Sequence, residues 1–285
     1  SNEINKSIML PMCLDGAFIM NKNIRAINNK KRNVEPLFTD GDVYLLYNRT
    51  DTYTMNEIHK LDDIVSFQFI NAGHILGSCQ LILYIKTPTG QIKKIHISSD
   101  LGSEYNRQPF VPSKDMVSSS DFSMIEATYN ELGRGFKSKK EVEKERNEFK
   151  TFLKNELKNK HNVLIGVFAQ ARQQTMMEFL YRTFKDDKDF NYPIYIDGVL
   201  GNNLNNVYLS VLEGEDKAYW QEVMSWGKFH YIGSYEKSME VALNKEETKL
   251  VLSSSGMFQA GRVTNHLKAM IEKKPMQFLY ASGES

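Results

Sequence analysis

Alternation of hydrophobic and polar positions predicts strands in the middle of the chain's first half. The alternation covers residues 65–69 and 81–85, which are separated by a glycine-flanked loop at 72–78. A turn signal follows at 87–90, where proline comes early and glycine late, so the chain should return as a hairpin strand through 92–97. The pattern therefore predicts an antiparallel β unit, preceded by a stretch of mixed helix and turn.

A different pattern begins at Lys137 and predicts alternating helices and strands. A run of lysine and glutamate carries apolar residues at helical spacing, which is typical of a solvated helix with one buried stripe: Val142, Phe149, Leu153 and Leu157. Apolar strands then alternate with helical stretches, the strands being expected at 163–168, 193–197, 249–253 and 276–281. This alternation predicts βαβ units and a largely parallel, Rossmann-like sheet, with a domain boundary near residue 130.

Composition and charge exclude several classes of protein. The chain is 41% hydrophobic, which is enough for a real core and excludes disorder, and 36 basic against 35 acidic residues leave a net charge of +1. Any site for a polyanion must therefore be a local patch. No apolar run approaches the roughly 20 residues that span a bilayer, so we expect a soluble, cytoplasmic protein. Cys13 and Cys79 form no ligand motif or disulfide scaffold and are interpreted as buried thiols.

His74 and Asp100 are candidate ligands for a metal ion. His74 lies in the loop at 72–78, and Asp100 follows the hairpin's return strand. Taken singly, a hydrogen-bonded histidine and a turn aspartate are the more economical interpretations. Together, an imidazole and a carboxylate from adjacent β segments are ligand types of a hydrolytic zinc or manganese site.

The other titratable residues are less informative. Glu126 follows a short apolar strand at 122–125, and it is either a solvated strand-end carboxylate or an acid that orients a histidine. We expect His96 to be an exposed strand residue and His266 to have a surface or capping role. His59 carries no prediction.

The second half of the chain contains a candidate phosphate site. Residues 253–262 join a strand to a helix through Gly256 and Gly261, with Arg262 at the start of the helix. Backbone N–H groups at such a turn bind phosphate, although many glycine turns are purely structural. Arg172 holds the equivalent position after the strand at 163–168, so we expect both arginines to converge on one crevice that takes a nucleotide or a phosphodiester.

Five motifs in order resemble the β-CASP group of the metallo-β-lactamase superfamily, which includes RNA-processing nucleases. They are AGHILGS at 72–78, SDLG at 99–102, EATY at 126–129, Phe168-Ala169 with Arg172, and SSGM at 254–257 with Gly261-Arg262. The resemblance implies an α/β fold: a partial metallo-β-lactamase (αββα) sandwich at 1–130 and an inserted β-CASP domain with a Rossmann-like parallel sheet at 131–285.

The resemblance also implies a mechanism and a site. In the family, the histidine matching His74 binds one ion, and the aspartate matching Asp100 bridges the two ions of a dinuclear zinc centre that activates water against an RNA phosphodiester. Asp100 and Glu126 would be catalytic, with Glu126 supporting a downstream histidine. Substrate-binding residues would be Arg172, Ser255, Gly256, Gly261 and Arg262. RNA is the expected partner, a membrane is not, and a homodimer is a further hypothesis.

The chain departs from the family at its main ligand motif. No HxHxDH string is present, so the sequence is expected to be a fragment that begins after it, with weak or absent zinc binding and no activity as given. Smaller departures are Ala127, Asn130, Ala171, Gly198 and Ala260. Two alternatives to a truncated nuclease stay open: a metal-free RNA-binding or scaffolding paralogue, and a nucleotide-binding α/β protein without nuclease ancestry.

Overall fold

The computed structural model describes residues 1–29, 33–103, 108–128, 138–271 and 276–280, the last of these as backbone only. The chain divides into two compact units. The first comprises Ser1–Arg107 with Val111–Arg134, and the second comprises Gln108–Phe110 with Gly135–Ser285. The boundary expected near residue 130 lies outside the described residues. Among the described helices, none is long and apolar enough to cross a membrane.

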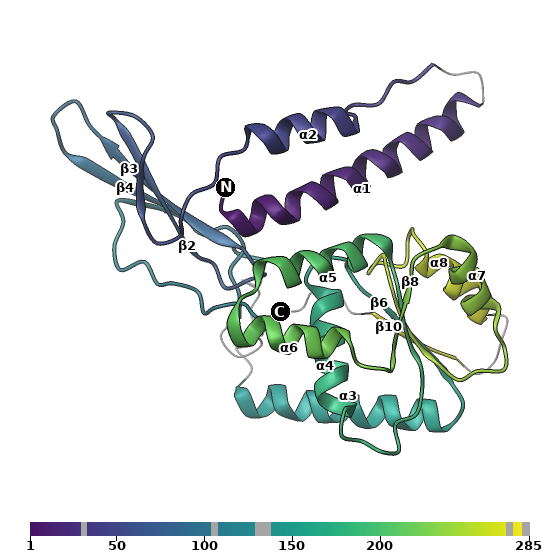
Figure 1. Cartoon of the computed structure of the whole chain (residues 1–285). Helices are drawn as coiled ribbons and strands as arrows, with labels where there is room; N and C mark the ends of the chain where they lie inside the picture. The colour runs from purple at the N-terminus through teal and green to yellow at the C-terminus, as the bar shows by residue number, and fades with distance from the viewer. Residues whose placement is uncertain (30–32, 104–107, 129–137, 272–275, 281–285) are drawn as a thin grey trace. The chain divides into compact units, whose positions relative to one another are not determined.

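The first unit contains a five-stranded sheet in the order β1-β2-β3-β4-β5. Figure 1 labels its strands β2, β3 and β4. Its strands are β1 (Ile58–Lys60), β2 (Val65–Asn71), β3 (Cys79–Lys86), β4 (Ile92–Ile97) and β5 (Phe122–Met124). The first four are antiparallel, and β5 pairs in parallel with β4. The predicted hairpin is confirmed: it closes through Gly90, whose φ is +83° and whose N–H donates to the Thr87 carbonyl at 2.9 Å.

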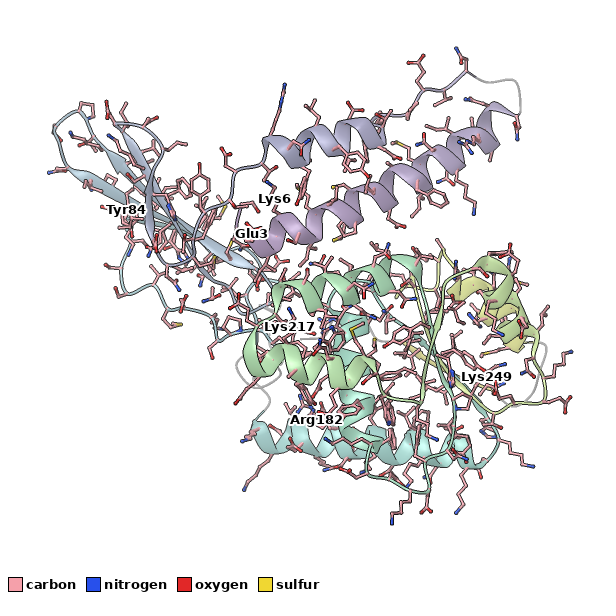
Figure 2. All side chains as sticks on the ribbon, viewed as in Figure 1. Glu3, Lys6, Tyr84, Arg182, Lys217 and Lys249 are labelled. Carbon is pink, nitrogen blue, oxygen red and sulfur yellow. The ribbon has the colours of Figure 1, made fainter. Side chains whose placement is uncertain are left out.

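Two helices precede this sheet, α1 (Glu3–Asn28) and α2 (Asp40–Arg49). Asn2 caps α1 by accepting from the Asn5 N–H at 2.8 Å. Thr39 and Asp42 form a reciprocal capping box at the start of α2. The two helices pack together. The ammonium of Lys6, labelled in Figure 2, lies 4.8 Å from the centre of the Tyr47 ring and makes a cation–π contact with it.

The second unit is built on a parallel five-stranded sheet in the order β10-β6-β9-β7-β8. These strands are β6 (Asn162–Gly166), β7 (Ile194–Asp197), β8 (Phe229–Ile232), β9 (Leu250–Ser253) and β10 (Met276–Tyr280). The central strands β6 and β9 are near-continuous apolar runs whose side chains are buried on both faces, as a parallel sheet covered by helices requires. The predicted parallel sheet is confirmed.

Among the described residues, six helices surround this sheet: α3 (Lys139–Lys158), α4 (Arg172–Phe184), α5 (Val199–Val211), α6 (Gly214–Met224), α7 (Tyr235–Leu243) and α8 (Val263–Ile271). Right-handed crossovers place α4, α5 and α6 on one face and α7 and α8 on the other. The contacts of α6 with α4 and α5, and of α7 with α8, agree with this division (Figure 1).

Two details of these helices bear on the sequence predictions. The lysine- and glutamate-rich helix is confirmed as α3, which buries Val142, Leu153 and Leu157. The segment from Gly214 to Leu243, with α6, β8 and α7, was not predicted. Lys249 is fully buried beside that segment, and its ammonium donates to the carbonyls of Val241 and, at 2.8 Å, Asn244, which closes the end of α7 (Figure 2).

Candidate functional site

The loop that carries His74 is a tight turn between β2 and β3. Gly73 and Gly77 have φ of +72° and +83°, a region that favours glycine. The Ser78 hydroxyl oxygen accepts from the N–H groups of His74 and Ile75, each at 3.1 Å. These two bonds fix the backbone of the loop and therefore the position from which the His74 side chain projects.

The loop that carries Asp100 lies directly against the loop of His74. The Gly102 N–H donates to the Ala72 carbonyl at 2.9 Å. A Cβ atom at Gly102 would lie 1.7 Å from the Gly73 carbonyl oxygen, so only glycine permits this approach. Two segments that are separated in sequence by the whole β3–β4 hairpin are thus joined where Ala72 and Gly73 meet Gly102, next to the residues His74 and Asp100 in sequence.

Glu126 lies against the loop that carries Asp100, also in the first unit. Its two carboxylate oxygens accept from the Thr128 N–H at 2.7 Å and from the Leu101 N–H at 3.3 Å. The pKa of Glu126 is held below its ordinary value mainly by the hydrogen bonds from Thr128, and the bond from Leu101 and the nearby His74 add to the effect. Glu126 is therefore an ionised carboxylate that ties the Asp100 loop to the end of β5.

His74 and Asp100 do not by themselves fit a catalytic zinc centre. His74 is half-buried, and its Nδ1 is buried without a hydrogen-bond partner among the described residues, whereas Asp100 is exposed. A catalytic zinc takes three protein ligands. Within the described ranges, no group of three or more histidine, cysteine or acidic side chains is placed to hold an ion. We therefore assign no metal-dependent step to these residues.

The expectation of an exposed His96 is wrong. His96 is only 7% exposed, and its Nε2 lies 2.7 Å from Gln80 Oε1. Burial lowers the pKa of His96, as does the charge of Lys94 to a smaller extent, so the imidazole is neutral. The Gln80 amide nitrogen donates in turn to the carbonyls of Asn71 and Asp115 at 2.7 and 2.8 Å. This buried pair holds the end of β2 just before the His74 loop, and Gln80 was missed in the sequence.

In the second unit, the candidate residues lie where the sheet changes the direction of its crossovers. β9 lies between β6 and β7, whose following helices cover one face, while α8, which follows β9, covers the other. Open α/β sheets bind ligands at such switch points, outside the carboxyl ends of the strands. The loops at 167–171 and 254–262 leave the sheet at this point.

These two loops are in contact. A Cβ at Gly166 would lie 2.7 Å from the Phe258 ring, and one at Gly256 would lie 3.2 Å from the backbone nitrogen and ring of Phe168. Gly261 has φ of +79°, and a Cβ there would lie 2.7 Å from the Ser254 carbonyl oxygen. The glycines therefore allow the loop after β9 to fold back tightly beside the loop after β6.

Arg262 lies at the start of α8 and points toward the ends of β7 and β8. Its Nη1 donates to Asp197 Oδ1 at 2.8 Å, and its Nη2 donates to the Gly233 carbonyl at 3.3 Å. Arg172 is half-buried and begins α4, whose N-terminus has no side-chain cap. Ser255 is held within its loop, where its N–H donates to the Ala260 carbonyl at 3.2 Å.

A buried carboxylate that sequence reasoning missed organises this region. Asp197, fully buried at the end of β7, accepts from His266 Nε2 at 2.6 Å, from the Ser238 hydroxyl at 2.5 Å and from Arg262. Burial alone would raise the pKa of Asp197, but the bonds from His266, Ser238 and Arg262 outweigh burial and hold the pKa below its ordinary value. His266 is fully buried, so the surface or capping role expected for it is wrong. The sequence signal that could have identified Asp197 was an acidic residue at the end of the strand expected at 193–197.

The second unit is thus an open parallel α/β domain with glycine-rich loops at the switch point of its sheet. Residues 173–279 match the Beta-Casp domain. The chain therefore carries a Beta-Casp domain, and its resemblance to the β-CASP group of the metallo-β-lactamase superfamily is confirmed. The α/β fold class expected from that resemblance is confirmed as well.

Similar proteins extend over most of the chain. An RNase J-like protein of Methanocaldococcus jannaschii is 26% identical over 251 residues, which cover 88% of this chain and 56% of the relative. The transcription termination factor FttA of the same organism is 24% identical over 268 residues, which cover 90% and 40%. Ribonuclease TTHA0252 of Thermus thermophilus is 25% identical over 247 residues, which cover 82% and 52%. The chain spans about half the length of the curated relatives it matches.

Proposed function

We propose that the chain is part of an RNA-processing nuclease of the β-CASP group and that its second unit binds the sugar–phosphate backbone of RNA. The observation that carries the proposal is the glycine-rich loop at 254–262, which lies at the switch point of the parallel sheet and within the residues 173–279 that match the Beta-Casp domain. Relatives named as a ribonuclease and as an RNase J-like protein favour RNA as the ligand. Hydrolysis, a homodimer and a cytoplasmic location are predictions for the whole protein.

The proposed phosphate site combines backbone and side-chain groups. The backbone N–H of Gly256 would face phosphate oxygens, the bond from the Ser255 N–H to the Ala260 carbonyl would hold the loop in shape, and Gly261 would allow the loop to close behind them. Arg172, at the positive end of α4, would supply a phosphate contact. Arg262 already shares its charge with Asp197, so its main contribution would be to hold the loop in place.

Binding of single-stranded RNA at several salt concentrations tests this site. We expect the logarithm of the association constant to fall linearly with the logarithm of salt concentration. Arg172→Ala should reduce the slope by about 0.7, the value of one phosphate contact on a single strand. Arg262→Ala should weaken binding with a smaller change of slope. Fluorescence anisotropy of a labelled RNA measures both, and a salt-independent association would refute the proposal.

Zinc dependence is a separate part of the proposal. His74 and Asp100 would be two of the ligands in the complete protein, with the remaining ligands supplied from outside the described residues. In the complete gene product, we expect His74→Ala and Asp100→Ala to abolish RNA cleavage while RNA binding and folding are retained. Undiminished cleavage by either variant would contradict the assigned roles.

A metal-free RNA-binding or scaffolding protein is the second candidate function. The absence of a three-ligand group among the described residues favours it. A complete gene product that binds RNA, contains no zinc by elemental analysis and cleaves no RNA would support this candidate against the nuclease.

A further inference from the structure

Phe168 is a large aromatic residue that remains partly exposed at the end of a buried strand. It follows β6 and is 40% exposed, whereas Val167 beside it is fully buried. Its backbone is anchored, because its carbonyl accepts from the Gln173 N–H at 3.0 Å in the first turn of α4. The backbone that carries the exposed ring is therefore anchored at the switch point of the sheet.

The neighbouring loop supports one side of this ring and leaves the rest open. Gly256 lies against Phe168, since a Cβ at Gly256 would meet Cδ2 of the ring at 3.2 Å. Met257, the next residue, is also large and apolar and is 46% exposed. One exposed apolar side chain, Phe168, thus lies beside the loop that is proposed to bind phosphate, and another, Met257, belongs to that loop. Burying them against a ligand would be favourable.

We propose that Phe168 is a stacking platform for one nucleobase of single-stranded RNA whose adjoining phosphate is held by the loop at 254–262. This inference rests on the proposed function and adds to it a contact with a base. The ring is a planar apolar surface, and every base offers it a matching face, so the contact tolerates any sequence. Double-stranded RNA, whose bases are already stacked, should not use this platform.

The test measures the affinity of the 285-residue chain for an RNA oligonucleotide that carries one 2-aminopurine. We expect Phe168→Ala to weaken binding about tenfold, as base–aromatic contacts do, without changing the salt slope, because stacking releases no counterions. Phe168→Trp should restore the affinity. Binding to the wild type should change the 2-aminopurine fluorescence, and the alanine variant should lose this change at saturating protein.

A matched control is Tyr235→Ala, which removes a 55% exposed aromatic ring at the start of α7. This variant should bind RNA like the wild type. If the wild type binds RNA and Phe168→Ala binds equally well with the same fluorescence change, the stacking inference is overturned while the phosphate site stands. If the wild type binds no RNA, both the inference and the proposed function fail. Thermal unfolding of each variant checks that the fold is intact.

Discussion

Removing the buried charge of Asp197 should destabilise the second unit strongly. Asp197→Ala leaves the Ser238 hydroxyl and His266 Nε2, both in fully buried residues, without their acceptor. An unpaired buried donor costs about 1–3 kcal/mol. Arg262 is 19% exposed and can turn partly toward water, so its loss is smaller. The expected total is about 3–5 kcal/mol, which is a large part of the stability of a typical domain.

Tryptophan fluorescence during urea unfolding measures this loss selectively. The chain has two tryptophans, Trp220 and Trp226, and both belong to the second unit, so their emission reports that unit alone. Asp197→Asn, which preserves the shape of the side chain, should also cost about 3 kcal/mol. The control Asp186→Asn removes an exposed carboxylate after α4 and should change stability by less than about 0.5 kcal/mol.

The pH dependence gives a second check of the same charge. Because the folded pKa of Asp197 is lowered from 3.8, its contribution to stability is fully present above pH 3.8 and is lost as the pH falls through the folded value. The stability difference between wild type and Asp197→Asn should therefore shrink in that acid range. A loss below about 1 kcal/mol at neutral pH, or a difference that grows on acidification, would refute the assignment of a buried ionised carboxylate.

Further predictions concern the first unit and its loops. Gly102→Ala should cost about 3 kcal/mol or more, because its Cβ would overlap the Gly73 carbonyl, whereas Gly227→Ala, with open space around it, should be nearly neutral; thermal unfolding followed by circular dichroism compares the two. Gln80→Leu should cost about 2–3 kcal/mol and speed hydrogen exchange in residues 71–79, because His96 and two carbonyls lose their partner; unchanged exchange would argue against this support. Thr39→Ala should lower the thermal stability of the first unit by about 1 kcal/mol through loss of the α2 capping box, and an unchanged melting curve would contradict that.

The hydrophobic pattern predicts the parts of the fold in which local and long-range preferences agree. The hairpin formed by β3 and β4 combines largely apolar strands with a proline–glycine turn between them, and β6 and β9 are short apolar runs followed by helical stretches. In the segment with α6, β8 and α7, the local sequence pattern does not mark the faces that are buried in the fold. The buried side of α7 consists of Ser238, Val241 and Ala242, a small and partly polar set that no apolar stripe marks.

The candidate site is harder to predict because its contacts join distant residues. Asp197 and His266 are 69 residues apart, and their hydrogen bond depends on the neighbouring positions of β7 and β9, which strand patterns do not specify. His96 lies on a strand that is apolar on one side, so its own position indicated exposure, and only the Gln80 side chain on β3 makes its burial favourable. The glycine-rich turns could be predicted from the sequence, because two backbone segments that approach closely require glycine at the point of contact.

Photo-crosslinking of a 4-thiouridine RNA to the chain, followed by mass spectrometry of the crosslinked peptides, tests the central claim most directly. We predict crosslinks in the segments 167–172 and 254–262, with loss of those crosslinks when unlabelled single-stranded RNA is in excess. Crosslinks confined to other segments, such as the lysine-rich helix α3, would contradict RNA binding at the switch point.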